Sequence, residues 1–514
     1  MKKVYVFLLL ILSTINYGQN KDLASLSNGS LINFSPLYNE NEQLFGYIVL
    51  FGKGKISDVE QKFEFVFLDK NLNKVANKDF EAEISVYNYK FGVNNKNQII
   101  LYPDYKDFFS SKKERDRTII AKERLIDLKS NTVTILNNYC YTDKQIVVCN
   151  ETTTVGEKKQ AAKDLSKDLG YAYYSRVEQL EDDSFLVHET SSKNKGFYFE
   201  NKYTLFSPEK KVMWTYELPK DIKKDDRVYI ETIYFDKEYW NFIETNIHKD
   251  KATFKFVRIN LKTGQKLIEE YLPESKNRSY YSLFRFGGQK GGIYNKKDFD
   301  DKLIIMGILI DSEEKQNRIG FYKVEVDKIK NKISIVDMPF TDAKSFLPKI
   351  NEKGVVENGY KLQIRDLFIL KNGEVGLLFE KFKYSYIPMA GSIPKATDLI
   401  CFLADEKFKL KEVKTFEKDK SLADIGDYLY SYNINDDSGV VFYYKDKQKN
   451  EEGDKNWNLY ISVYKNGKFS QEKIPISSKE NTIFPYIAKE GYILLREYNK
   501  NSKYNGIRLE RLNF

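Results

Sequence analysis

Histidine, the side chain used most often for general acid–base catalysis and metal binding, occurs only twice in the 514 residues. His188 lies in the apolar stretch 185–189 (FLVHE), and His248 follows Asn246-Ile247. Neither has a second histidine or a cysteine at ligand spacing, so we expect no metal site and no cofactor. The chain also lacks a Gly-x-Ser-x-Gly elbow, a phosphate-binding loop and a dinucleotide fingerprint. We therefore assign no catalytic residue, and interpret His188 as a packed or hydrogen-bonded strand residue.

One segment has the composition of a contact surface. Residues 383–394 (KYSYIPMAGSIP) contain Tyr384, Tyr386 and Met389 together with two prolines. We expect a long loop between two strands here, and a rigid, partly apolar loop suits binding. These three residues are our binding candidates. The alternative is a loop that folds back over its own sheet.

Three cysteines are present. Cys140 and Cys149 flank a short hairpin that turns near residues 143–144, and in an oxidising compartment they can form a local disulfide. The alternative is two small buried thiols. Cys401 lies inside the apolar run 399–403 (LICFL), so we expect it in the core.

The first 18 residues have the pattern of a secretory signal peptide. A basic start (MKK) precedes nine apolar residues, 4–12, and Gly18 offers a small residue for cleavage. Nine apolar residues are too few to span a bilayer, and a buried N-terminal strand is the alternative. No later segment is apolar enough to span a membrane, so we expect an exported, soluble chain in the periplasm or outside the cell.

The charge does not indicate a nucleic-acid binder. Loss of Lys2 and Lys3 with the signal peptide lowers the formal charge from +9 to +7, and basic and acidic residues alternate along the chain. A nucleic-acid-binding protein would concentrate positive charge on one face. We expect a solvated, lysine-rich surface, no nucleic-acid partner, and a monomer.

The patterning of the remaining chain favours strands. Aromatic residues make up 15% of the sequence, which suits strands, and apolar and polar residues alternate in segments such as 322–327 and 459–463. Helical patterning is clear only over residues 157–169, and the next residue, Gly170, is typical of a helix C-terminus. A second short helical turn is expected near residues 341–349.

The strands recur as a repeat. Four segments end a strand with an apolar residue and then proline, at Pro219, Pro273, Pro339 and Pro475. A copy without proline occupies residues 411–416. Each copy closes a unit of four antiparallel strands in roughly 50–65 residues, which is the size of a β-propeller blade whose outer edge tolerates proline. The pattern predicts blades near residues 35–84, 85–140, 172–219, 226–273, 280–339, 360–416, 427–476 and 483–514.

We therefore predict an all-β protein with one β-propeller domain, residues 19–514, of seven or eight four-stranded blades. Residues 141–171 would form a small helical and hairpin insertion. The last unit has only three candidate strands, and residues 30–34 (SLINF) would supply its fourth. A pair of β-sandwiches is the main alternative. A membrane barrel is disfavoured because Glu510 and Arg508 spoil the lipid face of the final strand.

The four-strand units of the whole mature chain resemble those of the secreted β-propeller-like proteins of lysine- and asparagine-rich bacterial genomes. The Gly-His…Trp-Asp pairing, the sialidase Asp box and recurring kelch glycine pairs of other propellers are missing. The resemblance implies the architecture, and it implies no activity and no catalytic residue.

Our functional prediction is a binding or scaffolding module for a protein or glycan in the cell envelope. The alternative is a carbohydrate-active hydrolase or lyase, because such propellers work with two or three carboxylates near the axis. Glu178, Glu231 and Asp366 occupy first-strand positions, where a carboxylate would project toward that axis. Residues 433–439 have oxygen-rich spacing, but we interpret them as a turn since the glycine falls one residue late for a calcium loop.

Overall fold

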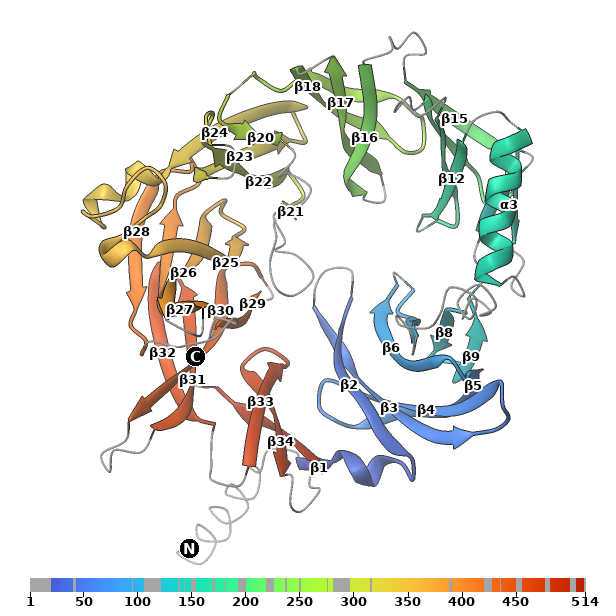
Figure 1. The fold of residues 1–514 in the computed structure, drawn as a ribbon, viewed down its shortest axis with the longest axis horizontal. Helices are drawn as coiled ribbons and strands as arrows, with labels where there is room; N and C mark the ends of the chain where they lie inside the picture. The colour runs from blue at the N-terminus through green and yellow to red at the C-terminus, as the bar shows by residue number, and fades with distance from the viewer. Residues whose placement is uncertain are drawn as a thin grey trace, which may run out of the picture. The chain divides into compact units, whose positions relative to one another are not determined.

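Strands account for most of the computed structural model (Figure 1). None of the helices in the described ranges has the length and hydropathy that a bilayer-spanning helix requires. The described residues are 20–39, 43–94, 96–105, 122–136, 139–142, 144–148, 154–168, 172–180, 182–192, 200–218, 226–235, 238–248, 251–274, 276–280, 296–314, 317–387, 391–419, 428–434, 436–449, 455–476, 481–499 and 505–512.

The chain divides into two compact units. The first comprises residues Met1–Cys140, Val147–Asp164 and Ile476–Phe514, and its described part holds three four-stranded antiparallel sheets. The first sheet contains β2 (Ser30–Tyr38), β3 (Leu44–Lys55), β4 (Glu60–Leu68) and β5 (Lys74–Glu83). The second contains β6 (Val86–Val93), β7 (Ile99–Tyr105), β8 (Arg124–Asp127) and β9 (Thr132–Ile135). The third contains β33 (Asn481–Ile487), β34 (Tyr492–Asn499), β35 (Asn505–Arg511) and β1 (Asn20–Asp22).

The second unit comprises residues Tyr141–Ile146 and Leu165–Pro475, and the described residues of this unit hold five sheets of four or five strands. The first two sheets of this unit contain β12 (Ala172–Gln179), β13 (Phe185–Ser192), β14 (Glu200–Phe206) and β15 (Val212–Glu217), and then β16 (Asp226–Phe235), β17 (Tyr239–His248), β18 (Lys251–Asn260) and β19 (Lys266–Tyr271). The third sheet contains β20 (Arg278–Ser279), β21 (Lys296–Asp298), β22 (Lys302–Ile310), β23 (Arg318–Asp327) and β24 (Lys332–Pro339). The last two contain β25 (Lys361–Ile369), β26 (Val375–Ile387), β27 (Gly391–Ala404) and β28 (Leu410–Phe416), and then β29 (Tyr428–Asn433), β30 (Gly439–Lys449), β31 (Lys455–Lys465) and β32 (Lys468–Pro475).

Apart from β1, which pairs with β35, and β21, which pairs with β22 as β20 does, the neighbouring strands of each of these sheets follow one another in the chain, as in the blades of a β-propeller. Eight sheets of this kind occur among the described residues, at the positions that the repeat predicted, so the all-β propeller class is confirmed. The outer strands β24 and β32 end on Pro339 and Pro475, where an edge strand needs no N–H for pairing. The single-domain boundary of 19–514 stays a prediction.

The small elements also follow the sequence. The helix expected over residues 157–169 is α3 (Val155–Asp168), and the second helical turn is the 3-10 helix η3 (Phe340–Ser345). Strands β10 (Tyr139–Thr142) and β11 (Gln145–Val148) form the two-stranded hairpin of the predicted insertion. A turn was predicted between β29 and β30, and its described residues 434 and 436–438 connect the two strands, with the Asn433 amide donating to Asp437 Oδ1 at 2.7 Å.

Consecutive sheets pack through their apolar faces. In the second unit, for example, Trp240 and Phe242 of β17 pack with Leu205 of β14, while Ile243 of β17 packs with Leu303 and Val324 of the next sheet. Both faces of a central strand are therefore buried, and the aromatic surplus of the sequence is chiefly core.

The closing strand differs from the prediction. Residues Ser30–Phe34 do not complete the last sheet, because they begin β2 and pair with β3. The strand that pairs with β35 is β1, with Asn20 opposite Arg508 and Asp22 opposite Gly506. Three polar residues give no alternating pattern, which is why the sequence did not reveal this strand. Its anchor is the next residue, Leu23, which is fully buried.

Candidate functional site

A row of polar side chains crosses the sheet β12–β15. Arg176 lies opposite His188, His188 opposite Tyr203, and Tyr203 opposite Tyr216. Because directly paired residues of antiparallel strands share one face of the sheet, these four side chains form a line from the first strand to the last. On the same face, the neighbouring row is mainly apolar and consists of Glu178, Leu186, Leu205 and Trp214.

The centre of the row is tightly held. The His188 and Tyr203 rings are stacked, with centroids 4.2 Å apart and planes 6° apart. The Trp240 ring of the next sheet contacts Tyr203 at a centroid distance of 5.0 Å. His188 Nε2 and Thr190 Oγ1 are 2.8 Å apart, so a hydroxyl also fixes the imidazole. Burial raises the pKa of the Tyr203 phenol, Arg176 lowers it and Glu178 raises it, and the net shift is upward.

Tyr216, the last residue of the row, contacts a buried carboxylate, that of Glu244. The Tyr216 hydroxyl donates to Glu244 Oε2 at 2.7 Å, and Lys255 Nζ lies 2.9 Å from Glu244 Oε1. Burial and the hydrogen bond to Glu244 raise the pKa of Tyr216. The Tyr216 phenol therefore stays protonated and serves as a donor that links two neighbouring sheets.

The first strand of the neighbouring sheet completes a cavity of about 510 Å³. Ile230, Glu231 and Thr232 of β16 line it opposite β12. Because β16 is the edge strand of its sheet, three consecutive residues border the cavity. The Trp240 indole donates to Thr232 Oγ1 at 3.0 Å, which fixes this wall. The remaining lining residues are Arg176, Glu178, Leu186, His188 and Tyr203.

The cavity joins three residues that the sequence analysis had singled out, Glu178, Glu231 and His188. The interpretation of His188 as a packed, hydrogen-bonded strand residue is confirmed. Its place on a cavity wall was not predicted, and neither was that of Arg176 or Tyr203. Arg176 precedes the candidate Glu178 by two residues, so period-2 alternation alone places both side chains on one face.

Asp366, the third first-strand carboxylate, lies elsewhere. It is on β25 and accepts hydrogen bonds from the Tyr428 hydroxyl and, at 2.7 Å, from the Ser431 hydroxyl of β29. Burial raises the pKa of Asp366 although both hydroxyls lower it. This carboxyl joins two sheets. His248 ends β17 with an exposed side chain and does not line the cavity.

The predicted loop from Lys383 to Pro394 is instead an extension of two paired strands. Strand β26 runs to Ile387, and β27 begins at Gly391, with Tyr384 opposite Pro394 and Tyr386 opposite Ser392. The structure differs from the predicted loop because the residues of this segment continue the alternating pattern of the two strands, so the strands extend through it. The Tyr384 and Tyr386 side chains are 68% and 77% exposed. Met389, the third binding candidate, lies outside the described residues.

The other face of this hairpin is braced. Lys381 forms ion pairs with Glu357 and, at 3.0 Å, with Asp398. Lys383 Nζ donates to the Asn358 carbonyl at 3.0 Å and lies 4.3 Å from the centre of the Tyr360 ring. The two exposed tyrosines thus stand on a supported strand. Whether they bind a partner stays a prediction.

The cysteine predictions are tested in part. Cys401 is a fully buried free thiol, as expected, and burial raises its pKa. Cys140 lies on β10, whereas Cys149 lies outside the described residues, so the disulfide stays a prediction.

The comparisons with known proteins give similarity of shape alone. No protein-family model and no curated protein sequence matches the chain. Among solved structures, the WD40 domain of SCAP from fission yeast is 8% identical at a TM-score of 0.34, covering 96% of this chain and 97% of that one. The polysaccharide lyase Uly1 is 10% identical at a TM-score of 0.32, covering 96% and 99%. A PL25 ulvan lyase is 9% identical at 0.30, covering 82% and 91%.

Similarity at this level says nothing about activity or about particular residues. The class of the protein, an all-β propeller, follows from its strand order and from the packing of consecutive sheets.

Proposed function

We propose that this chain is an exported β-propeller that binds a neutral glycan in the cavity between β12 and β16. The observation that carries the proposal is the lining, in which a guanidinium, two carboxylates, an imidazole and the hydroxyl-bearing residues Tyr203 and Thr232 surround about 510 Å³. Cavities of this size hold small ligands, and a few fixed polar groups set their orientation. Carboxylates accept hydrogen bonds from sugar hydroxyls, and the Arg176 guanidinium donates to sugar oxygens.

Charge favours a neutral ligand over an anionic one. Arg176 supplies one positive charge, whereas Glu178 and Glu231 supply two negative charges. An anionic polymer would meet this excess of negative charge, while a neutral oligosaccharide would not. The stacked His188–Tyr203 pair and the Trp240–Thr232 hydrogen bond hold the two walls in place, which lowers the cost of ordering the site on binding.

A binding measurement tests this proposal. Neutral and acidic oligosaccharides would be screened on an array against the mature protein, and hits measured by calorimetry. Arg176→Ala and Glu231→Gln should each weaken binding about tenfold or more, which corresponds to about 1.4 kcal/mol. His248→Ala is the matched control, since His248 is exposed outside the cavity, and it should bind like the wild type. Binding that prefers acidic glycans, or that ignores both cavity variants, would contradict the proposal.

A second candidate is cleavage of the glycan in the same cavity. The observation that favours it is that Glu178 and Glu231 come from two different sheets and border one space, together with His188 and Tyr203. A general acid and a general base on opposite walls are what hydrolysis or β-elimination requires. Incubation with the bound glycan should then release new reducing ends or an unsaturated product, and Glu178→Gln and Glu231→Gln should remove that activity. Binding without any product would exclude this candidate.

Export rests on the basic and apolar start of the sequence. Strand β1 begins at Asn20, two residues beyond the proposed cleavage point at Gly18, so cleavage there keeps the closing strand. N-terminal mass spectrometry of the protein from a native envelope extract should find a chain that lacks the apolar segment 4–12 and starts at Gln19. A cytoplasmic protein with an intact Met1 would contradict export.

A further inference from the structure

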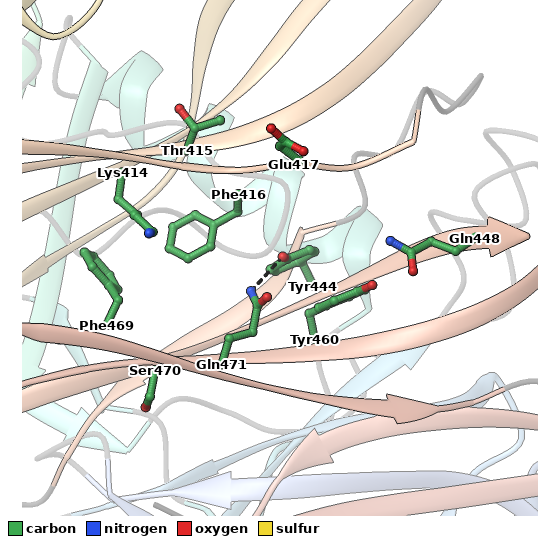
Figure 2. Close-up of a pocket in the computed structure, with 10 residues that line it drawn as sticks. All are labelled: Lys414, Thr415, Phe416, Glu417, Tyr444, Gln448, Tyr460, Phe469, Ser470 and Gln471. Atoms are coloured by element: carbon green, nitrogen blue, oxygen red, sulfur yellow. Dashed lines mark hydrogen bonds between the residues drawn. The ribbon is translucent and has the colours of Figure 1, made fainter.

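A second cavity, of about 410 Å³, lies between the outer strands of the sheets β25–β28 and β29–β32 (Figure 2). Its first wall consists of residues 414–416 at the end of β28 and the next residue, Glu417, and its second wall is residues 469–471 of β32. Side chains from β30 and β31 lie between them. It shares no residue with the cavity between β12 and β16.

The base of this cavity is made of aromatic rings in fixed positions. The Tyr444 and Tyr460 rings are stacked, with centroids 5.0 Å apart and planes 7° apart. The Phe416 ring meets the Phe469 ring edge-on at 5.4 Å. Figure 2 shows the Phe416 ring extending from β28 toward the side of the cavity on which Phe469 lies. Phe416, Tyr444 and Tyr460 are all buried, so they offer edges and hydroxyls rather than open ring faces.

Two primary amides lie among these rings. Gln471 Nε2 donates to Tyr444 Oη at 2.9 Å and to Ser462 Oγ at 3.0 Å. Both amide protons are thereby used, which fixes the amide plane and leaves the Gln471 carbonyl oxygen as an acceptor. Gln448 of β30 is held by Lys473, whose Nζ donates to Gln448 Oε1 at 2.9 Å. Amide groups of this kind match the N–H and C=O groups of a peptide backbone.

The two walls are edge strands. β28 and β32 are each the last strand of their sheet, so each has one side whose N–H and C=O groups pair with no strand of the described chain. An extended peptide can add to such an edge, with its alternate side chains entering the pocket beside it. A carbohydrate would instead need exposed aromatic faces on which to stack, and the rings here are packed against one another.

We propose that this cavity binds an extended peptide, which pairs with the outer edge of β28 and inserts one apolar side chain beside Phe416 and Phe469. Lys414 and Glu417 are the charged residues of the lining, and their formal charges cancel, so the peptide is expected to be neutral around the inserted side chain. This site is independent of the proposed glycan site.

Peptide selection provides the test. A random-peptide phage library would be panned against the full mature protein, and selected peptides measured by fluorescence anisotropy. Gln471→Trp fills the cavity and Gln471→Ala removes the acceptor, so the first should abolish binding and the second should weaken it about tenfold. Ser334→Trp, an exposed serine on the outer strand β24, is the matched control and should leave binding unchanged. Circular dichroism would confirm that all three variants fold.

The mode of binding is tested by methylating each backbone nitrogen of the peptide in turn. Pairing with a strand edge uses every second N–H, so methylation at alternate positions should remove binding while methylation at the positions between should not. Three results would overturn the proposal: no enriched peptide, a peptide that binds Gln471→Trp as tightly as the wild type, or equal sensitivity to methylation at every position.

Discussion

The His188 ring lies flat against the Tyr203 ring, with 4.2 Å between their centroids and 6° between their planes. The two residues are directly paired on β13 and β14, so strand register alone brings them face to face. Tyr203 is buried, whereas His188 is partly exposed to the cavity. The pair therefore joins the core of the sheet to the proposed glycan site.

Truncating the two residues one at a time should show that Tyr203 mainly stabilises the fold and that His188 mainly supports glycan binding. Tyr203→Ala should lower the free energy of unfolding by about 3–5 kcal/mol, because it removes a large buried ring. His188→Ala should cost only about 1 kcal/mol, the contribution of an aromatic contact, while still weakening glycan binding. Thermal unfolding and calorimetric binding of both variants would check this. Equal destabilisation by the two variants would contradict the assignment of His188 to the cavity wall.

Glu380 is the centre of a buried ion network. Its carboxylate contacts Arg365 at 2.6 Å and Lys418 Nζ at 2.6 Å, and the Glu380 and Lys418 side chains are both 0% exposed. Glu380→Ala should destabilise the protein by about 3–5 kcal/mol, because two cations would remain buried without their anion.

The matched control for Glu380 is an exposed ion pair. Lys62 and Asp79 lie 2.9 Å apart with side chains that are 42% and 39% exposed. Asp79→Ala should change stability by less than about 1 kcal/mol, since water screens such a pair. Urea unfolding of both variants provides the comparison. If Glu380→Ala lowers the free energy of unfolding as little as Asp79→Ala does, the ion network contributes little to stability.

Asp366 should make stability depend on pH in a direction opposite to that of most carboxylates. Burial raises its pKa above the ordinary value of 3.8, so between the unfolded and folded pKa values the folded state binds more protons. Stability then falls as pH rises through this window. The stability of the wild type relative to Asp366→Asn, which cannot ionise, should therefore decrease with rising pH. A difference that is constant or grows with pH would show that the Tyr428 and Ser431 hydrogen bonds outweigh burial.

The closing strand β1 should depend on Leu23. This residue is fully buried with Phe34, Tyr47 and Leu509, directly after the three residues that pair with β35. Leu23→Ala should cost about 2–5 kcal/mol and should speed amide hydrogen exchange in β35. Val59→Ala in the same unit, where the side chain is 68% exposed, should cost less than about 0.5 kcal/mol. Unchanged exchange in β35 would mean that Leu23 does not hold the strand.

The three cysteines should differ in reactivity. Cys401 is buried and its raised pKa keeps it as a thiol, so it should not react with an aromatic disulfide reagent in the native protein. If Cys140 and Cys149 are bonded, the native protein shows no reactive thiol, the unfolded protein shows one, and the unfolded and reduced protein shows three. Three reactive thiols without reduction would exclude the disulfide.

Local patterns in the sequence were sufficient for the fold class. Alternation with a period of two, turn residues and outer-strand prolines such as Pro339 and Pro475 are properties of neighbouring residues, so the four-strand unit can be recognised without knowing what packs on it. The same reasoning placed α3. It failed at β1, where three polar residues have no pattern, and between Tyr384 and Pro394, where prolines indicated a loop although the strands continue.

The candidate sites depended on the tertiary structure. Arg176, His188 and Tyr203 lie on three successive strands and meet through strand register, while Glu231 reaches them only because the next sheet packs on the same face. Asp366 has the same first-strand position in its own sheet, yet two hydroxyls from the neighbouring sheet bury it. Apart from β1 and the ends of β26 and β27, the sequence by itself determined where the strands of each sheet lie. Packing between sheets decided which carboxylates border a cavity and which become part of the core, because that depends on the side chains that the adjacent sheet presents.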